Sequence, residues 1–205
     1  WTPPGAEAAG SEIVPWSEIE AAFRLEDVTH SPAFFDVKKL AAFNGDYIRM
    51  MPLDEFIERA GDELPADWDR DRFAAIAPHI QERLTTLREV PEKIDFLFWP
   101  EDAEIAYDDD SWAKAFGPDW STPLLADVTG AYEQLEVWTA EALKDALEDV
   151  MTRYEIKLGK AQAPVRVAVP ARAGGPPLFE SMEELGRSET LRRLMLARGA
   201  APDAG

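Results

Sequence analysis

Short apolar runs at helical spacing, divided by proline, limit most strongly what this chain can fold into. Apolar residues in the segment 69–90 recur every three or four positions, which places them on one face of a helix. They are Phe73, Ile76, Ile80, Leu84 and Leu87. The chain has 16 prolines, and proline is accepted in the first turn of a helix but interrupts its interior. The pattern predicts an all-α fold built from many short helices.

Similar patterns continue along the chain. We expect helical segments at residues 16–23, 31–51, 52–61, 69–90, 91–99, 121–135, 139–156, 177–186 and 187–199. Pro78 should divide the fourth of these segments into two helices. Residues 1–15 are predicted to be a loop or linker, and a second loop, between 99 and 120, should hold Y-D-D-D and F-G-P-D-W. Residues 165–169 (V-R-V-A-V) alternate like a strand, but a strand without a partner is not stable.

The negative charge of the chain is concentrated in its first three quarters. The formal net charge is −19, yet residues 160–205 hold seven basic and five acidic residues. Residues 157–169 contain three cations and no acid, with Arg166 set between two valines. Nonspecific affinity for nucleic acid grows with the number of cations that contact phosphates. The charge balance therefore argues against broad phosphate neutralisation and leaves room for a few specific contacts with RNA.

Composition argues against several other classes of protein. The chain has no cysteine, so neither disulfides nor thiolate metal sites can form. No run reaches the ~18 apolar residues that a membrane-spanning helix needs, and the acidic start lacks a signal-peptide pattern. An apolar fraction of 46% with seven tryptophans is typical of a globular protein. We expect a cytoplasmic protein that does not enter membranes.

The usual catalytic and metal-binding motifs are missing. The sequence has no glycine-rich phosphate loop and no G-x-S-x-G turn. His30 and His79 lack the glutamate three positions earlier that helical di-metal sites use, and we expect His30 to be an exposed histidine at a helix end. Residues 108–110 are three aspartates without the glycine and distal glutamate of a calcium loop, and they should form a solvated turn. We therefore expect no catalytic residue, no metal site and no bound cofactor.

Residues 34–49, F-F-D-V-K-K-L-A-A-F-N-G-D-Y-I-R, carry a recognisable motif. They resemble the Phe-Asp-x-x-Lys-Leu-x-x-x-Asn-x-x-Tyr-Ile-Arg signature that follows the catalytic half of bacterial-type glutamyl-tRNA synthetases. Residues 86–98 (T-L-R-E-V-P-E-K-I-D-F-L-F) resemble a second block of that family, and residues 158–169 with 176–194 resemble its C-terminal end. The blocks keep the order and spacing of the family over most of the chain, from Trp16 to Leu194.

The resemblance implies a fold and an organisation. It implies the all-helical anticodon-binding region of a class I aminoacyl-tRNA synthetase, in two subdomains. Residues 1–30 would be a linker and short helix after the catalytic half, residues 31–105 the first helical subdomain, and residues 106–205 the C-terminal anticodon-binding subdomain. The His-Ile-Gly-His-type and Lys-Met-Ser-Lys-Ser-type elements that hold ATP in these enzymes are not in this sequence. The chain alone should therefore be inactive.

The resemblance also implies partners. The parent enzyme would attach glutamate to tRNA(Glu) using ATP and Mg²⁺, with the catalytic domain in cis to this chain. Whether tRNA(Gln) is also a substrate stays open. No contact with DNA or a membrane is implied. The acidic remainder of the chain would oppose nonspecific binding of polyanions and leave a small cationic face for reading.

The family's first anticodon-reading arginine falls on Arg83, just before the T-L-R-E block. Glutamate anticodons end in cytosine and glutamine anticodons in guanine. The pairing edge of cytosine offers two acceptors to a guanidinium, and a good bidentate contact discriminates between bases by ~1–3 kcal/mol. Two alternatives stay open. Arg83 would be one of several solvent-facing arginines on that helix, or Gln81, two residues earlier, would take its role if the alignment shifts.

Four further anticodon contacts are implied near the C-terminus. Arg166 matches the arginine of the family's Gln-Pro-Leu-Arg segment, although the glutamine is displaced here to Gln162. Pro176, Leu178 and Phe179 lie where the family packs apolar surface on splayed bases, as single-stranded loops are often read. The alternative for Leu178 and Phe179 is that they anchor the last helices in the core.

Two other functional classes remain open. The chain would be a stand-alone acidic helical domain that binds proteins if it had no affinity for tRNA. It would be a small helical enzyme if acidic side chains converged on a cleft or a metal ion, but no spacing in the sequence demands either.

Overall fold

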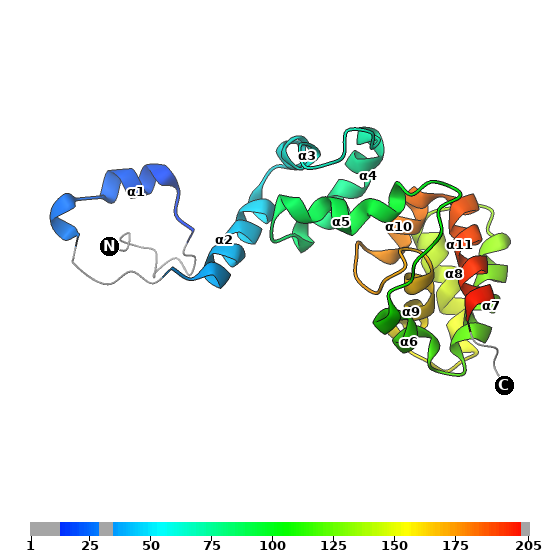
Figure 1. The fold of residues 1–205 in the computed structure, drawn as a ribbon. Coiled ribbons are helices and arrows are strands. Elements are labelled where there is room, and N and C mark those ends of the chain that lie inside the picture. The colour runs from blue at the N-terminus through cyan, green and yellow to red at the C-terminus, as the bar shows by residue number, and fades with distance from the viewer. Residues whose placement is uncertain (1–12, 29–34, 202–205) are drawn as a thin grey trace.

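A computed structural model describes residues 13–28 and 35–201, and in these residues it contains helices and no strand (Figure 1). The α-helices are α1 (Trp16–Ala22), α2 (Val37–Met50), α3 (Leu53–Gly61), α4 (Arg70–Ile80), α5 (Val90–Ile94), α6 (Asp109–Phe116), α7 (Ser121–Glu133), α8 (Ala140–Thr152), α9 (Leu158–Ala168), α10 (Leu178–Leu185) and α11 (Arg187–Ala200). Four short 3-10 helices are η1 (Leu25–Asp27), η2 (Gln81–Arg83), η3 (Leu87–Glu89) and η4 (Asp95–Leu97). The predicted all-α fold is confirmed.

Polar side chains fix where several helices begin. The carboxylate of Asp36 accepts hydrogen bonds from the backbone N–H groups of Lys38 and Lys39 and so caps α2. Asp69 caps α4 in the same way. Such caps satisfy N–H groups that have no partner inside the helix. The two caps explain why helices form where the apolar pattern predicted them, at 31–51 and 69–90.

One predicted loop contains a helix. Between residues 99 and 120 we expected an irregular loop and a solvated turn at 108–110. Instead, Asp108 accepts a hydrogen bond from the backbone of Ser111 and caps α6. The helix buries Ala115 and Phe116, and the next two aspartates occupy its first turn, where negative charge favours a helix. The prediction of a loop was wrong for residues 109–116.

Pro78 does not divide a helix as predicted. It lies inside α4, in the last turn, and the helix continues to Ile80 before the 3-10 helices η2 and η3 follow. Residues 165–168, which alternate like a strand, are the end of α9. His30 and most of the predicted linker at 1–15 lie outside the described residues. No helix in the part of the chain that the structure describes is long and apolar enough to cross a membrane.

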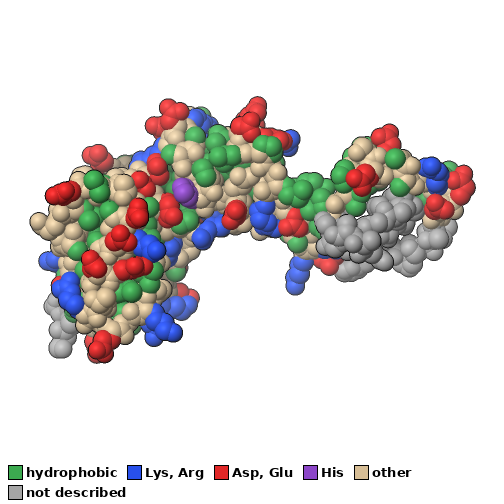
Figure 2. All heavy atoms as spheres, turned by 180° about the vertical axis from the view of Figure 1, so that it is seen from behind, with side chains coloured by type: hydrophobic (Ala, Val, Ile, Leu, Met, Phe, Trp, Pro, Cys, Tyr) green, Lys and Arg blue, Asp and Glu red, His purple; other side chains and the backbone are tan. Residues whose placement is uncertain are grey.

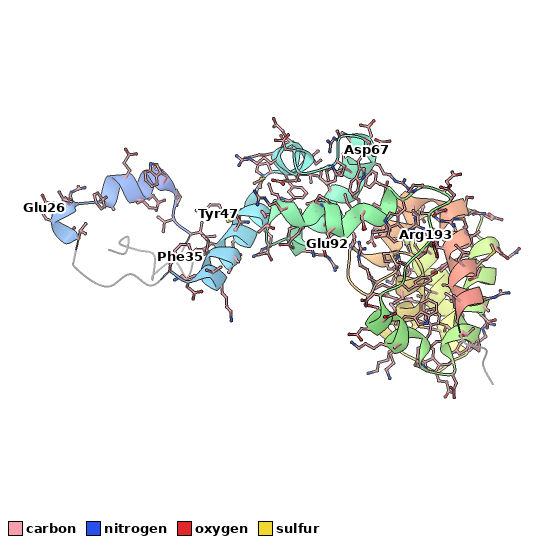
Figure 3. All side chains as sticks on the ribbon, in the orientation of Figure 1. Glu26, Phe35, Tyr47, Asp67, Glu92 and Arg193 are labelled. Atoms are coloured by element: carbon pink, nitrogen blue, oxygen red, sulfur yellow. The ribbon has the colours of Figure 1, made fainter. Side chains whose placement is uncertain are left out.

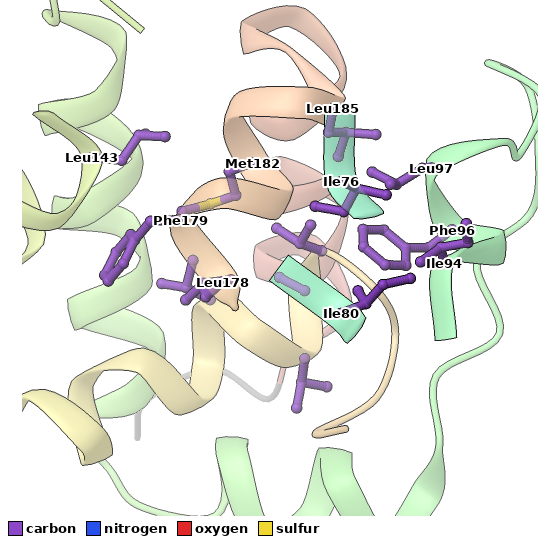
Figure 4. Close-up of a cluster of buried hydrophobic side chains, with 14 of the residues drawn as sticks. Ile76, Ile80, Ile94, Phe96, Leu97, Leu143, Leu178, Phe179, Met182 and Leu185 are labelled. Atoms are coloured by element: carbon purple, nitrogen blue, oxygen red, sulfur yellow. The ribbon is translucent and has the colours of Figure 1, made fainter. Parts of the chain in front are cut away.

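One hydrophobic core runs through the molecule from Ile48 to Ala197. Figure 1 shows α2 leading to a middle part made of α3–α5, and then to a bundle of α6–α11. Helix α10 joins the two, because it contacts α4 and η4 on one side and α8 and α11 on another. Figure 4 shows its side chains between those of α4, η4 and α8. The predicted subdomain boundary at 105/106 stays a prediction, but both sides of it share this core.

Gly186 allows the sharp turn between α10 and α11, with φ 87° and ψ 161°. Few residues other than glycine adopt this conformation, and the strain is ~1–3 kcal/mol. We expect Gly186→Ala to lower the free energy of unfolding by about that amount, measured by urea denaturation. Gly130 in α7 is the control: a Cβ atom there, as at Gly186, would meet nothing within 4 Å. Because its φ is ordinary, Gly130→Ala should stabilise by up to about 1 kcal/mol. Changes of the same sign would contradict the explanation.

Candidate nucleic-acid interface

Arg83 ends η2, directly after α4, and its side chain is exposed. It takes part in no ion pair or side-chain hydrogen bond with the residues that the structure describes. Gln81, the alternative reader, is placed differently. Its side chain is buried, and Nε2 donates to the carbonyls of Ile48 (2.8 Å) and Met51 (2.7 Å) at the end of α2. Gln81 therefore holds α2 against η2, and Arg83 is the side chain that is available to a ligand.

Arg166 lies on α9 and is half-buried. Its Nη1 donates a hydrogen bond of 2.9 Å to the carbonyl of Pro176. Burial lowers the pKa of the Arg166 guanidinium, the positive charge of Arg83 lowers it further, and Glu180 opposes both effects. The charge of Arg83 therefore acts on Arg166, although the two arginines are 83 positions apart in the sequence.

The proximity of two arginines is unfavourable unless something neutralises them. Like charges repel, and the repulsion is greater where burial reduces contact with water. Arg83 has no carboxylate partner among the described residues, and only Glu180 is close enough to favour the charged form of Arg166. A phosphate or the acceptor edge of a base would relieve this repulsion. The pair is therefore suited to bind an anionic, acceptor-rich ligand.

A small cavity of about 160 Å³ adjoins Arg166. Lys114 of α6 and Gln162 of α9 line it together with Arg166. Residues four positions apart share one face of a helix, so the displaced glutamine still lies beside the arginine. Three side chains that can donate hydrogen bonds therefore line the cavity.

Leu178 and Phe179 belong to the core. They are 3% and 8% exposed, and Figure 4 shows both within the cluster of buried side chains that α10 shares with α4 and α8. Because α10 has neighbours on several sides, adjacent residues in it are both covered. Core packing, the alternative for these two residues, is what the structure shows. Their predicted contact with bases stays a prediction. Pro176 is also buried, and its carbonyl is engaged by Arg166.

Charge is distributed unevenly over the face that Figure 2 shows. Lys and Arg side chains lie along the lower edge of the middle part, with Asp and Glu side chains between them, and Asp and Glu side chains cover much of its upper edge. Among residues 13–28 and 35–201, no three His, Asp or Glu side chains are placed to hold a metal ion.

Comparison with known proteins identifies relatives over nearly the whole chain. Residues 53–198 match the protein family described as "Anticodon binding domain". A glutamate–tRNA ligase of Frankia casuarinae is 53% identical over 207 residues, which cover 97% of this chain and 42% of the relative. A glutamate–tRNA ligase of Salinispora arenicola is 46% identical over 214 residues, which cover 98% and 44%. The chain thus spans about two fifths of the length of these relatives.

Solved structures show the same fold. The crystal structure of a glutamate tRNA ligase from Elizabethkingia meningosepticum superposes with a TM-score of 0.81 at 24% identity, covering 98% of this chain and 39% of that one. A glutamate–tRNA synthetase from Elizabethkingia anophelis gives a TM-score of 0.77. Both similarities cover the helices that carry Arg83 and Arg166.

Proposed function

The chain belongs to the anticodon-binding domain family, and we propose that it recognises the anticodon of tRNA(Glu) as part of a glutamate–tRNA ligase. The observation that carries this proposal is the match of residues 53–198 to the anticodon-binding family. It is supported by Arg83, an exposed cation that pairs with no described residue and whose charge acts on Arg166, in a protein whose net charge is −19. An acidic protein gains little from placing two like charges together unless they serve a ligand. An anticodon loop supplies both phosphates and unstacked bases with acceptor edges.

Arg83 reads the last anticodon base in this proposal. Its unpaired guanidinium offers two parallel donors, and the pairing edge of cytosine offers two acceptors. Guanine would present its own N–H donors to the same group, so tRNA(Gln) would bind less tightly. Arg166 contacts the other anticodon bases with donors that Pro176 leaves free.

Aminoacylation belongs to the rest of the parent enzyme. The relatives extend well beyond the region that this chain matches. We assign to that remainder the class I catalytic domain, with ATP and Mg²⁺, which would attach glutamate to the bound tRNA. This chain supplies none of the motifs for that chemistry. Its place of work would be the cytoplasm, where tRNA is charged.

The test compares two anticodon stem–loops of tRNA(Glu) that differ only in the last anticodon base, C or G. We expect the chain to bind the C form about tenfold to a hundredfold more tightly, because one bidentate contact is worth ~1–3 kcal/mol. Arg83→Gln should bring this ratio close to one. Fluorescence anisotropy at two salt concentrations measures the four affinities.

The matched control is Arg88→Gln. Arg88 lies five residues further on, its side chain is 87% exposed, and its contact with Glu63 is long, 4.0 Å. The substitution also removes one positive charge, so the affinities for the C and G stem–loops should fall equally and the ratio of the two affinities should not change. Equal binding of the C and G forms by the unaltered chain would point to an enzyme that accepts tRNA(Gln). No binding even at low salt would favour the protein-interaction alternative.

A further inference from the structure

The loop between α9 and α10, residues 169–177, is held from outside by hydrogen bonds from several elements. It connects the helix that carries Arg166 to the helix at the centre of the core. The bonds are Arg166 Nη1 to the Pro176 carbonyl (2.9 Å), the Asp108 N–H to the Ala171 carbonyl (2.9 Å), the Ala173 N–H to Ser111 Oγ (3.1 Å), and Arg172 Nη2 to the Glu92 carbonyl and to Asp95 Oδ1 (2.5 Å each).

Arg172 makes the contact that reaches furthest in the sequence. It joins the loop to the end of α5 and the start of η4, about 80 positions earlier. The Glu92 carbonyl belongs to the last turn of α5 (Figure 3), where carbonyls lack partners inside the helix and a cation is favoured. Asp95 Oδ1 also accepts a hydrogen bond of 2.8 Å from the backbone of Phe96. The backbone N–H of the next residue therefore orients the Asp95 carboxylate, and Arg172 binds to a carboxylate that is already held in place.

The backbone beside Arg172 is strained. Ala171 has φ 62°, a left-handed conformation that residues with a side chain adopt at a cost. Such a conformation persists where the surroundings over-determine it. Here the Asp108 N–H holds the Ala171 carbonyl, and Arg172 holds the next residue. Without Arg172, one of these two restraints is lost and the loop can relax.

This contact links the two arginines of the interface. Arg83 lies on the segment that continues through η3 into α5, the helix that Arg172 contacts. Arg166 is bonded to Pro176 on the loop that carries Arg172. Arg172 therefore joins the segment that carries Arg83 to the loop that Arg166 contacts.

We propose that Arg172 is a positioning residue that sets the separation between Arg83 and Arg166, and thereby the discrimination between anticodon bases. The proposal rests on the function proposed above. Bidentate hydrogen bonds tolerate little displacement, because they weaken steeply with distance and angle. A functional group is held well only when the residues around it are themselves locked. Arg172 provides that lock through Asp95 and Glu92.

The distance between the segment that carries Arg83 and the loop that holds Arg166 can be measured without RNA. Because the chain has no cysteine, Glu82→Cys and Ala173→Cys give two unique sites for spin labels beside Arg83 and Arg172. Pulsed electron–electron double resonance then reports the distribution of distances between the two spin labels. We expect one narrow distribution in the parent, a broader and longer one with Arg172→Met, and recovery with Arg172→Lys, which keeps a cation that can reach Asp95. An unchanged distribution with Arg172→Met would overturn the proposal.

The functional readout is the ratio of affinities for the C and G stem–loops. Arg172→Met should lower this ratio by about threefold or more, since a displacement of about 1 Å weakens a bidentate contact. Arg172→Lys should retain most of it. Lys93→Met is the matched control, because Lys93 lines the same pocket as Arg172 and, among the described residues, forms an ion pair with Glu89 alone. It removes one cation and should leave the ratio unchanged.

The two proposals fail in different ways. If the parent chain binds neither stem–loop while Arg172→Met still broadens the distances, the proposed function fails and the positioning role stands. If the parent discriminates between the stem–loops and Arg172→Met changes neither the distances nor the ratio, the positioning role fails alone. Thermal unfolding of each variant shows that the measurements are made on folded protein, and Asp95→Asn provides a second way to break the contact.

Discussion

Replacing Arg193 by methionine is expected to lower the free energy of unfolding by about 3–5 kcal/mol, the usual effect of removing one partner from a buried ion pair. Arg193 lies on α11, where that helix meets the middle part of the molecule (Figure 3), and its side chain is inaccessible to solvent. Its guanidinium donates to the carbonyls of Val169 (2.8 Å) and Phe96 (2.9 Å) and to Glu189 (2.7 Å). It also lies 4.8 Å from the ring of Trp99.

The cost arises from the groups that Arg193 would leave behind. Two buried carbonyls would lose their partners, and each unsatisfied group costs about 1–3 kcal/mol. One of these carbonyls follows α9 and the other belongs to η4, so the substitution also loosens the junction between the bundle and the middle part. Because domains of this size are stable by only about 5–15 kcal/mol, the variant should be close to unfolding at moderate temperature.

Arg192→Met is the matched control for Arg193. The two residues are adjacent, and both donate to Glu189, but Arg192 is partly exposed. Exposed ion pairs contribute less than about 1 kcal/mol, so urea denaturation should separate the variants clearly. Equal losses, or a loss below about 1 kcal/mol for Arg193→Met, would contradict the account of Arg193 as a buried link.

The charge on Glu189 supports the same arrangement. Burial raises its pKa, but the hydrogen bonds and positive charges of Arg192 and Arg193 outweigh that effect, and the net pKa is lowered. Because the pKa in the folded state lies below that in the unfolded state, this contribution to stability is complete above the ordinary glutamate value of ~4.3. It is lost as the pH falls through the lowered pKa. Near neutral pH the buried arginine therefore keeps its counter-charge.

Arg193 also shows where sequence patterns stop being informative. Four arginines lie in the last helix, and nothing in R-S-E-T-L-R-R-L-M-L-A-R distinguishes the buried one from its neighbours. The distinction depends on which face of α11 meets α7, α9 and α10. Apolar periodicity cannot identify the buried arginine, because the buried face of α11 includes this charged residue, whose hydrogen bonds go to carbonyls of distant segments.

Helix α9 illustrates a related limit. Val165 and Val167 alternate as in a strand, yet both are buried in a helix. Four helices, α6, α7, α8 and α11, contact α9, so residues on opposite faces of it are covered and the usual one-sided pattern disappears. The all-α fold was predictable because helices such as α3, α4 and α8 have one covered face and one exposed face.

The candidate interface was partly predictable. The positions of Arg83 and Arg166 came from a resemblance, and only the structure shows that the charge of Arg83 acts on Arg166. Leu178 and Phe179 were assigned to base stacking from the resemblance, but the packing of α10 covers both. Arg172 gave no signal in the sequence, since its partners Glu92 and Asp95 are remote and one of them contributes a backbone carbonyl.

Replacing both Arg83 and Arg166 by glutamine is expected to lower the affinity for the C-ended stem–loop by about a hundredfold or more. Each arginine that contacts bases is worth ~1–3 kcal/mol, and every 1.4 kcal/mol is tenfold in affinity. The losses of binding free energy in the two single variants should add up to more than the loss in the double variant. Each single substitution already removes the repulsion between the two arginines that RNA relieves on binding, so the sum of the single variants counts this contribution twice and the double variant counts it once.

The control must remove two positive charges elsewhere. Arg59 and Arg153 are suitable, because each has a side chain that is 61% exposed and pairs with a surface carboxylate. Arg59→Gln with Arg153→Gln changes the net charge of the chain by the same amount as the test pair. We expect it to change affinity by less than about threefold, since unscreened interactions reach only about 10 Å at ordinary salt.

Salt dependence then separates specific reading from general attraction to phosphate. A protein that neutralises many phosphates loses affinity steeply as salt rises, whereas few contacts give a shallow slope. With a net charge of −19, the chain should show a shallow slope, and the double variant should reduce it by no more than about two. A steep slope in the parent, or an equal loss of affinity in the Arg59 and Arg153 control, would mean that charge alone drives binding. The acidic surface would then have no role in confining RNA to the two arginines.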